Sequence, residues 1–201
     1  MGCAMAKKSK KKSKKKRKAG SGKAKGSSFE REICKRLSLW WTRGKSDQVF
    51  WRNSGFLTRG GTCVEHQYGD VHSISDEGKW FVSNVNVELK FYKDLRVLDV
   101  IDKPDKRHVT LLDHWCQCMA DAEASKREPL LIAKRNFAEP FVVCRSDFAR
   151  DLVEKDECIR MHACGYFLSV FPLTALEGNS AGDFMFVLGG LEQYREEVDD
   201  E

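Results

Sequence analysis

Hydrophobic residues return every three or four positions in two segments of the chain, which predicts two amphipathic helices. In the first, Phe29, Ile33 and Leu37 share one face of a helix that we expect over residues 28–41. The second is expected from Leu111 to about Lys126 and has the pattern of a helix packed on a sheet. Its apolar stripe consists of Leu111, Leu112, Trp115, Cys118, Met119 and Ala122.

Runs of β-branched and aromatic residues predict the strands, the first of them at residues 49–52. Strands at 69–75 and 80–91 are expected to form a hairpin, because the residues from Ser75 to Lys79 have the composition of a turn. Side chains alternate between the two faces of a strand. Val85, Val87 and Leu89 therefore share one face of the second strand, and Asn86, Glu88 and Lys90 share the other.

The second half of the chain continues the alternation of strands and helices, which predicts an α/β fold. We expect strands at 129–133 and 141–144, a helix near 147–155 capped by Ser146 and Asp147, and strands at 166–171 and 184–188. A chain of 201 residues, 41% of them hydrophobic, can bury the core of one domain.

Charge divides the chain into three parts. Residues 1–26 hold 12 lysines and arginines and no acid, so we expect a disordered polybasic arm. The remaining residues carry 23 bases against 30 acids, a net charge of −7. The folded domain is expected over 27–191, and residues 192–201 are expected to form an acidic tail that frays.

The arm favours nucleic acid as a partner. The start Met1-Gly2-Cys3 beside a basic run also suggests a lipid-anchored adaptor, but Ala6 stands where the acylation pattern has Ser or Thr. No stretch approaches the ~20 apolar residues of a membrane span, so no membrane is expected. We expect a cytoplasmic, nucleoid-associated protein in a bacterium or a phage-infected host, or a nuclear one if the source is eukaryotic.

The eight cysteines follow no secretory leader, so we expect reduced thiols, with Cys116 and Cys118 buried in the second helix. The pattern Cys158-x3-His162-x-Cys164 lacks the paired spacing of a structural zinc site. Whether these three residues bind a metal stays open.

One set of polar residues has the chemistry of phosphodiester hydrolysis, which requires a hard cation and a charge to neutralise the transition state. Asp70 opens one predicted strand, while Glu88 and Lys90 lie on one face of its predicted neighbour, about 7 Å apart along the strand. Taken singly, each residue is better explained as a strand-end acid or a solvated strand face. Their joint occurrence predicts an active site.

This pattern resembles the motif of the PD-(D/E)xK nucleases, an acid followed at a distance by (D/E)-x-K on a strand. Here it is Gly69-Asp70, then 17 residues, then Glu88-Leu89-Lys90, with Gly69 in place of the usual proline. The resemblance implies the restriction-endonuclease-like core, a helix, a mixed sheet carrying the motif, then a helix and a strand. It also implies Mg²⁺ held by Asp70 and Glu88, with Mn²⁺ as a substitute and no small-molecule cofactor.

The segment from Lys25 to Ile33 is similar to the first helix of archaeal-type Holliday junction resolvases and related phage nucleases. The resemblance covers residues 25 to about 93 and implies a further metal-binding acid at Glu30 and phosphate-site residues at Arg52 and Ser54. Glu30 also completes a capping box with Ser27, and the two roles are equally favoured. Arg31 near the phosphate and Gln117 on the following helix are possible accessory residues.

A basic cluster follows the motif and is expected to contact DNA. It consists of Lys93, Arg96, Lys106 and Arg107, with Arg59 before the motif. The resemblance implies a homodimeric, Mg²⁺-dependent Holliday junction resolvase that acts on branched DNA in recombination or repair. A restriction- or repair-type nuclease for duplex or single strands, and a non-catalytic DNA-binding protein on a nuclease-like core, are the alternatives.

Overall fold

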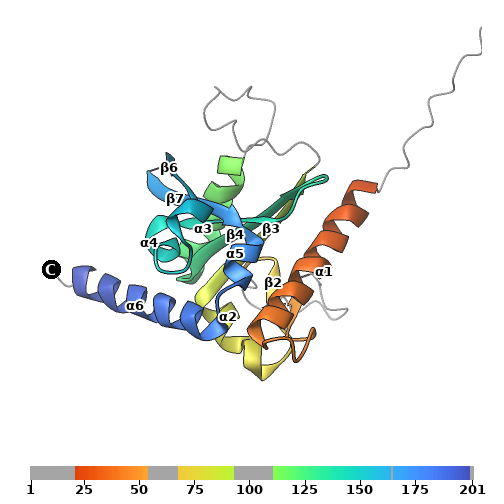
Figure 1. The fold of residues 1–201 in the computed structure, drawn as a ribbon, viewed down its shortest axis with the longest axis horizontal. Helices are drawn as coiled ribbons and strands as arrows, with labels where there is room; N and C mark the ends of the chain where they lie inside the picture. The colour runs from red at the N-terminus through yellow and green to blue at the C-terminus, as the bar shows by residue number, and fades with distance from the viewer. Residues whose placement is uncertain (1–20, 54–67, 93–110, 164, 200–201) are drawn as a thin grey trace, which may run out of the picture.

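The computed structural model describes residues 21–53, 68–92, 111–163 and 165–199. Their main feature is a five-stranded mixed sheet in the order β3-β4-β5-β7-β6 (Figure 1). Its strands are β3 (Val85–Tyr92), β4 (Glu128–Arg135), β5 (Phe141–Arg145), β6 (Ile159–Ala163) and β7 (Tyr166–Pro172). β3 and β4 are parallel, and the other neighbouring pairs are antiparallel.

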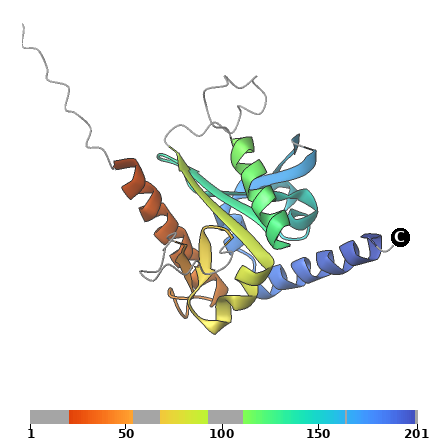
Figure 2. The same ribbon diagram turned by 180° about the vertical axis from the view of Figure 1, so that it is seen from behind.

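Helix α3 (Leu111–Ser125) connects β3 to β4 and covers one face of the sheet (Figure 2). Its buried residues Trp115 and Cys118 pack with Leu131 and Val143 in one of two core clusters. The predicted helix and its apolar stripe are confirmed, with Cys118 buried and Cys116 exposed. The expectation that both thiols are buried is therefore wrong for Cys116.

The opposite face of the sheet packs against α1 (Ser21–Trp41), whose buried residues Phe29, Ile33 and Leu37 belong to the larger core cluster. The predicted spacing is confirmed, but the helix begins before Ser27. Ser27 therefore lies inside the helix, and the predicted capping box is wrong. Its hydroxyl instead accepts a hydrogen bond of 3.0 Å from Arg52.

The predicted hairpin between residues 69–75 and 80–91 is also wrong. Strand β2 (Val71–Ser73) pairs with β1 (Phe50–Arg52), and a 3-10 turn (Asp76–Gly78) and helix α2 (Lys79–Asn84) lead into β3. The helix places Phe81 in an aromatic cluster with Trp40, Trp41 and Phe50, where its ring is fully buried. Tertiary packing of that ring outweighs the local preference of this segment for a strand.

The C-terminal strands β4, β5 and β7 follow the prediction, but two helices do not. α4 (Ser146–Ala149) is a single turn without a side-chain cap, where a longer capped helix was expected. The expected strand at 184–188 lies inside α6 (Ala181–Asp199), which follows the short helix α5 (Leu173–Glu177). α6 extends away from the sheet and includes most of the expected acidic tail (Figure 1).

The sequence did carry a signal for α6. Ser180 and Asp183 form a reciprocal capping box, in which each side chain accepts a hydrogen bond of 3.1 Å from the other's backbone amide. Phe184 and Leu188, four residues apart, are both buried, as on the inner face of a helix.

Candidate active site

Asp70 lies against the free edge of β3, although the predicted hairpin does not form. Its backbone amide donates to the Val87 carbonyl at 2.7 Å, and its carboxylate accepts from the Leu89 amide at 2.8 Å. The amide of Asn53 donates to its carbonyl at 2.7 Å. The first two bonds use backbone groups of Val87 and Leu89 at the outer edge of β3. They fix the Asp70 carboxylate beside the Glu88-Leu89-Lys90 segment.

Gly69 explains why the motif lacks its usual proline here. Its φ is +77°, which proline, with φ fixed near −65°, cannot adopt. A Cβ at this position would lie 2.8 Å from Asn86 Oδ1 and 2.9 Å from the Val87 carbonyl oxygen. The close approach of the Asp70 segment to β3 therefore requires glycine.

Glu88 and Lys90 share one face of β3, as the alternation predicts, and Lys90 Nζ donates a hydrogen bond to Glu88 Oε1. The Glu88 side chain is only 5% exposed and that of Lys90 19%. Burial, and next the charge of Asp70, raise the pKa of Glu88. Burial lowers the pKa of Lys90, but the hydrogen bond and charge of Glu88 outweigh it, so the net shift is upward.

Asp70 is subject to the same effects. Burial raises its pKa, while the Leu89 amide and the charge of Lys90 oppose that rise. Glu30 and Asp121 add to it through their negative charges. The site thus gathers more carboxylates than Lys90 alone balances, which is the electrostatic signature of a cation-binding position.

Glu30 reaches this neighbourhood from α1, where its carboxylate accepts a 2.7 Å hydrogen bond from Arg52 Nη1. Cys34 lies one turn further along α1. The pKa of its thiol is raised to about 12, first by burial and then by the negative charges of Glu30 and Asp70. The structure therefore brings together Glu30, Arg52, Asp70, Glu88 and Lys90.

Other predicted residues are not brought to the site by the structure. Arg31 and Gln117 are exposed on α1 and α3, and neither has a described contact with the acids. Ser54, Arg59, Lys93, Arg96, Lys106 and Arg107 lie outside the described residues.

Sequence reasoning missed two neighbours of the site, Asp121 and His114. Both lie on α3, and both interact electrostatically with the motif residues. The sequence contained a signal for these two residues, because they form a polar stripe with Gln117 along a helix whose other face is apolar.

The donor set fits a hard divalent cation. Asp70 and Glu88 supply carboxylate oxygens, the ligands that Mg²⁺ prefers. Asn86 Oδ1, two residues before Glu88, is buried without a hydrogen-bond partner among the described residues. Within those residues, no three His, Cys, Asp or Glu side chains lie close enough together to hold an ion. Glu30 therefore does not join the other two acids in a preformed three-acid cage.

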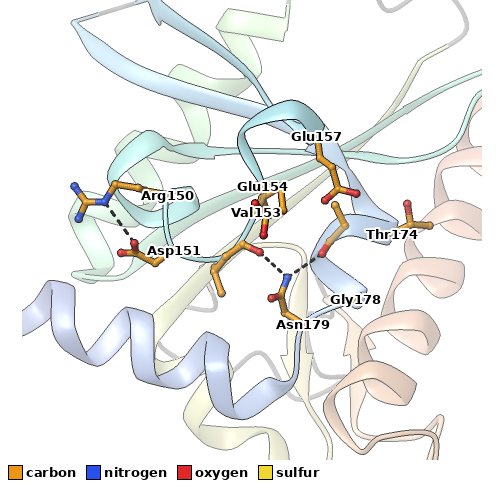
Figure 3. Close-up of a pocket in the computed structure, with 10 residues that line it drawn as sticks. Arg150, Asp151, Val153, Glu154, Glu157, Thr174, Gly178 and Asn179 are labelled. Carbon is orange, nitrogen blue, oxygen red and sulfur yellow. Dashed lines mark hydrogen bonds and ion pairs between the residues drawn. The ribbon is translucent and has the colours of Figure 1, made fainter.

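A separate hollow of about 380 Å³ lies away from these carboxylates (Figure 3). It is lined by residues 150–154, Glu157, Thr174, Ala175, Gly178 and Asn179. The Asn179 side-chain amide donates to the carbonyls of Leu152 and Ala175, which holds the wall together. The Asn179 side chain thus serves the fold.

The mixed sheet flanked by helices has the restriction-endonuclease-like fold of the PD-(D/E)xK nucleases, and Asp70 lies beside the Glu88-Leu89-Lys90 segment at the edge of that sheet. The family model described as "Phage putative PDDEXK endonuclease" matches residues 21–166, and the chain belongs to this family. No curated protein and no solved structure matches the chain. Within the described residues, no helix is both long and apolar enough to cross a membrane.

Proposed function

We propose that this nuclease is a divalent-metal-dependent DNA endonuclease whose active site is formed by Asp70, Glu88 and Lys90, with Glu30 in support. The observation that carries the proposal is the buried Glu88 carboxylate and the partly buried Asp70 carboxylate at β3, held beside the partly buried Lys90 ammonium group. We further propose branched DNA as the substrate, on the resemblance of the first helix and the following strand to junction resolvases.

A divalent cation bound at these oxygens would polarise the scissile phosphate and help to generate the nucleophile from water. The Leu89 amide holds the Asp70 carboxylate in place, and strand alternation holds Glu88 and Lys90 on one side. The Lys90 ammonium places positive charge and donatable protons where charge develops on the phosphate. Arg52, paired with Glu30, is positioned to bind a neighbouring phosphate once that pair opens.

Cleavage of junction, flap, duplex and single-stranded DNA with Mg²⁺ or Mn²⁺ tests this function. We expect wild-type protein to cut junctions best and Asp70→Asn and Lys90→Ala to lose at least about 100-fold in rate. Equal activity in all three proteins would overturn the assignment. Preference for linear DNA would instead identify a restriction- or repair-type enzyme. Metal-independent binding without cleavage would identify a DNA-binding protein on a nuclease-like core.

We propose that the basic arm supplies affinity for DNA without sequence preference. Residues 1–20 carry ten lysines and arginines, whereas the chain from residue 27 onward is net negative. Because α1 begins at Ser21, a chain that starts there keeps the helix. We expect this truncation to weaken DNA binding and to reduce the log–log slope of affinity against salt by about 0.9 for each phosphate that the arm neutralises. An unchanged slope would contradict the role, and the single-turnover rate on saturating DNA is the control.

We also propose a homodimer, because symmetric cutting of two strands requires two active sites. Sedimentation of the protein alone and with a junction tests this. A single site per junction, with unlinked cuts in the two strands, would contradict it.

A further inference from the structure

The helix that covers the active-site strand brings a histidine over the motif. Because β3 and β4 are parallel, the connecting helix α3 runs back along β3 in the opposite direction. The Asn86 side-chain amide donates to the Cys118 carbonyl at 3.2 Å, which fixes that turn of α3 over the start of β3. His114, one turn earlier in α3, therefore lies over the part of β3 that carries Glu88 and Lys90.

A second contact fixes the imidazole at the far end of this segment. The rings of His114 and Tyr92 stack with their centroids 4.8 Å apart and an interplanar angle of 23°. Tyr92 is the last residue of β3, two positions after Lys90 on the same face. The imidazole is thus held between α3 and the end of the motif strand.

His114 is 4% exposed, and its Nε2 atom has no hydrogen-bond partner among the described residues. Burying a polar nitrogen without a partner costs free energy, because the group loses its hydrogen bonds to water and gains none in the protein. Buried groups of this kind are uncommon in proteins, and a site that acquires a partner during function is one explanation.

Lys90 is the charged donor that this placement offers, because it lies two residues before Tyr92 on the face of β3 that the imidazole covers. After burial, the largest influence on the His114 pKa is the positive charge of Lys90, and both effects lower it. A pKa below the ordinary histidine value favours the neutral ring at neutral and alkaline pH, and a neutral imidazole has one nitrogen that accepts a hydrogen bond. Lys90 now donates to Glu88, an acid that the proposed reaction requires as a metal ligand.

We propose that His114 is a positioning residue for Lys90. Its Nε2 accepts a hydrogen bond from the Lys90 ammonium when the Glu88 carboxylate turns towards a divalent cation. The ammonium then keeps its place beside the scissile phosphate instead of following Glu88. This inference rests on the proposed nuclease function.

Two substitutions separate this role from packing. His114→Phe keeps a ring against Tyr92 but removes the acceptor, and we expect kcat to fall about 10-fold or more, which corresponds to one hydrogen bond of about 1.4 kcal/mol to a charged group. KM for DNA should be unchanged. His114→Gln places an amide oxygen near the Nε2 position and should recover most of kcat, although it removes the stacking. Equal kcat in His114→Phe and wild type, or no recovery in His114→Gln, would overturn the proposal.

A measurement without DNA provides an independent readout. In ¹⁵N-labelled protein, Mg²⁺ should move the His114 Nε2 resonance to that of a hydrogen-bonded acceptor. The signal is identified among the five histidines by its absence in His114→Phe. Lys90→Met is the matched control and should abolish the shift.

A resonance that does not move when Mg²⁺ is added, or that shifts equally in Lys90→Met, would overturn the proposal. Wild-type protein that shows the shift but cuts no DNA would overturn the nuclease function alone.

Discussion

Two buried acid–base pairs lie on neighbouring strands of the same sheet, and they differ in how their charges balance. Glu128, 2% exposed at the start of β4, accepts hydrogen bonds of 3.1 and 3.0 Å from Arg145 on β5. Glu88, 4% exposed in the middle of β3, accepts from Lys90 and has the carboxylate of Asp70 nearby.

The difference shows which pair serves the fold and which serves a site. The planar guanidinium of Arg145 binds both oxygens of Glu128, the geometry that best offsets the burial of a carboxylate. Lys90 is a single point charge that bonds to Glu88 while a second acid, the partly buried Asp70, lies close by. The excess negative charge that Asp70 brings beside β3 is unfavourable without a cation, as expected of residues that bind one.

The largest expected effect concerns the structural pair. Glu128→Gln should lower the free energy of unfolding by about 3–5 kcal/mol, because it removes the buried partner charge of Arg145 and leaves only the longer ion pair to the exposed Asp147, at 3.5 Å. Urea denaturation measures the loss. The double variant Glu128→Leu with Arg145→Met is the control and should recover much of it, since a buried pair is often replaced by apolar residues at little cost. A loss below about 1 kcal/mol in the single variant would remove the contrast between the pairs.

The next effect concerns the active-site pair. Glu88→Gln keeps the shape of the side chain but removes a proposed cation ligand, so we expect cleavage to slow by about 10²–10³-fold. Its stability should change far less than that of Glu128→Gln, because burial already disfavours the Glu88 charge. Single-turnover cleavage and urea denaturation of the two variants side by side measure this. Loss of stability without loss of activity would reverse the assignment.

The smallest effect is a change in the pH dependence of stability. Burial raises the pKa of Asp70, so the folded protein binds this proton more tightly than the unfolded chain does. The protein therefore loses stability as pH rises from the ordinary aspartate pKa, which applies to the unfolded chain, to the higher pKa of Asp70 in the folded state. Above the folded-state pKa the loss is complete. Asp70→Asn removes this loss, so the variant should be the more stable protein at about pH 8 in EDTA.

Denaturation of both proteins between about pH 4 and pH 8 measures the difference, which should shrink towards the acid end. A wild type that matches Asp70→Asn at every pH would show that the Asp70 charge is not destabilising. Added Mg²⁺ should stabilise the wild type more than the variant, because a ligand that binds only the folded state raises its stability.

The sequence predicted most of the elements that carry strong periodicity. The buried stripes of α1 and α3 and the strands β3, β4, β5 and β7 follow from spacing alone. One prediction failed because a distant contact decides the local structure. The segment before β3 is helical because Phe81 joins the aromatic cluster around Trp40, and no pattern within the segment reveals that cluster. The strand expected at 184–188 was wrong for a local reason, because the capping box at Ser180 starts a helix there.

The candidate site divides in the same way. Sequence alone determined the residue types, the order of Asp70, Glu88 and Lys90, and the shared face of the last two, because strand alternation is a local property. Only the tertiary structure decided that Asp70 bonds to the edge of β3 without a hairpin, that Gly69 must lack a side chain, and that Glu30 is held by Arg52. It also stacked His114 on Tyr92, two residues after Lys90, since that contact depends on how α3 crosses the sheet. Burial and the fields of neighbouring charges arise from packing, and they set the protonation chemistry of the site.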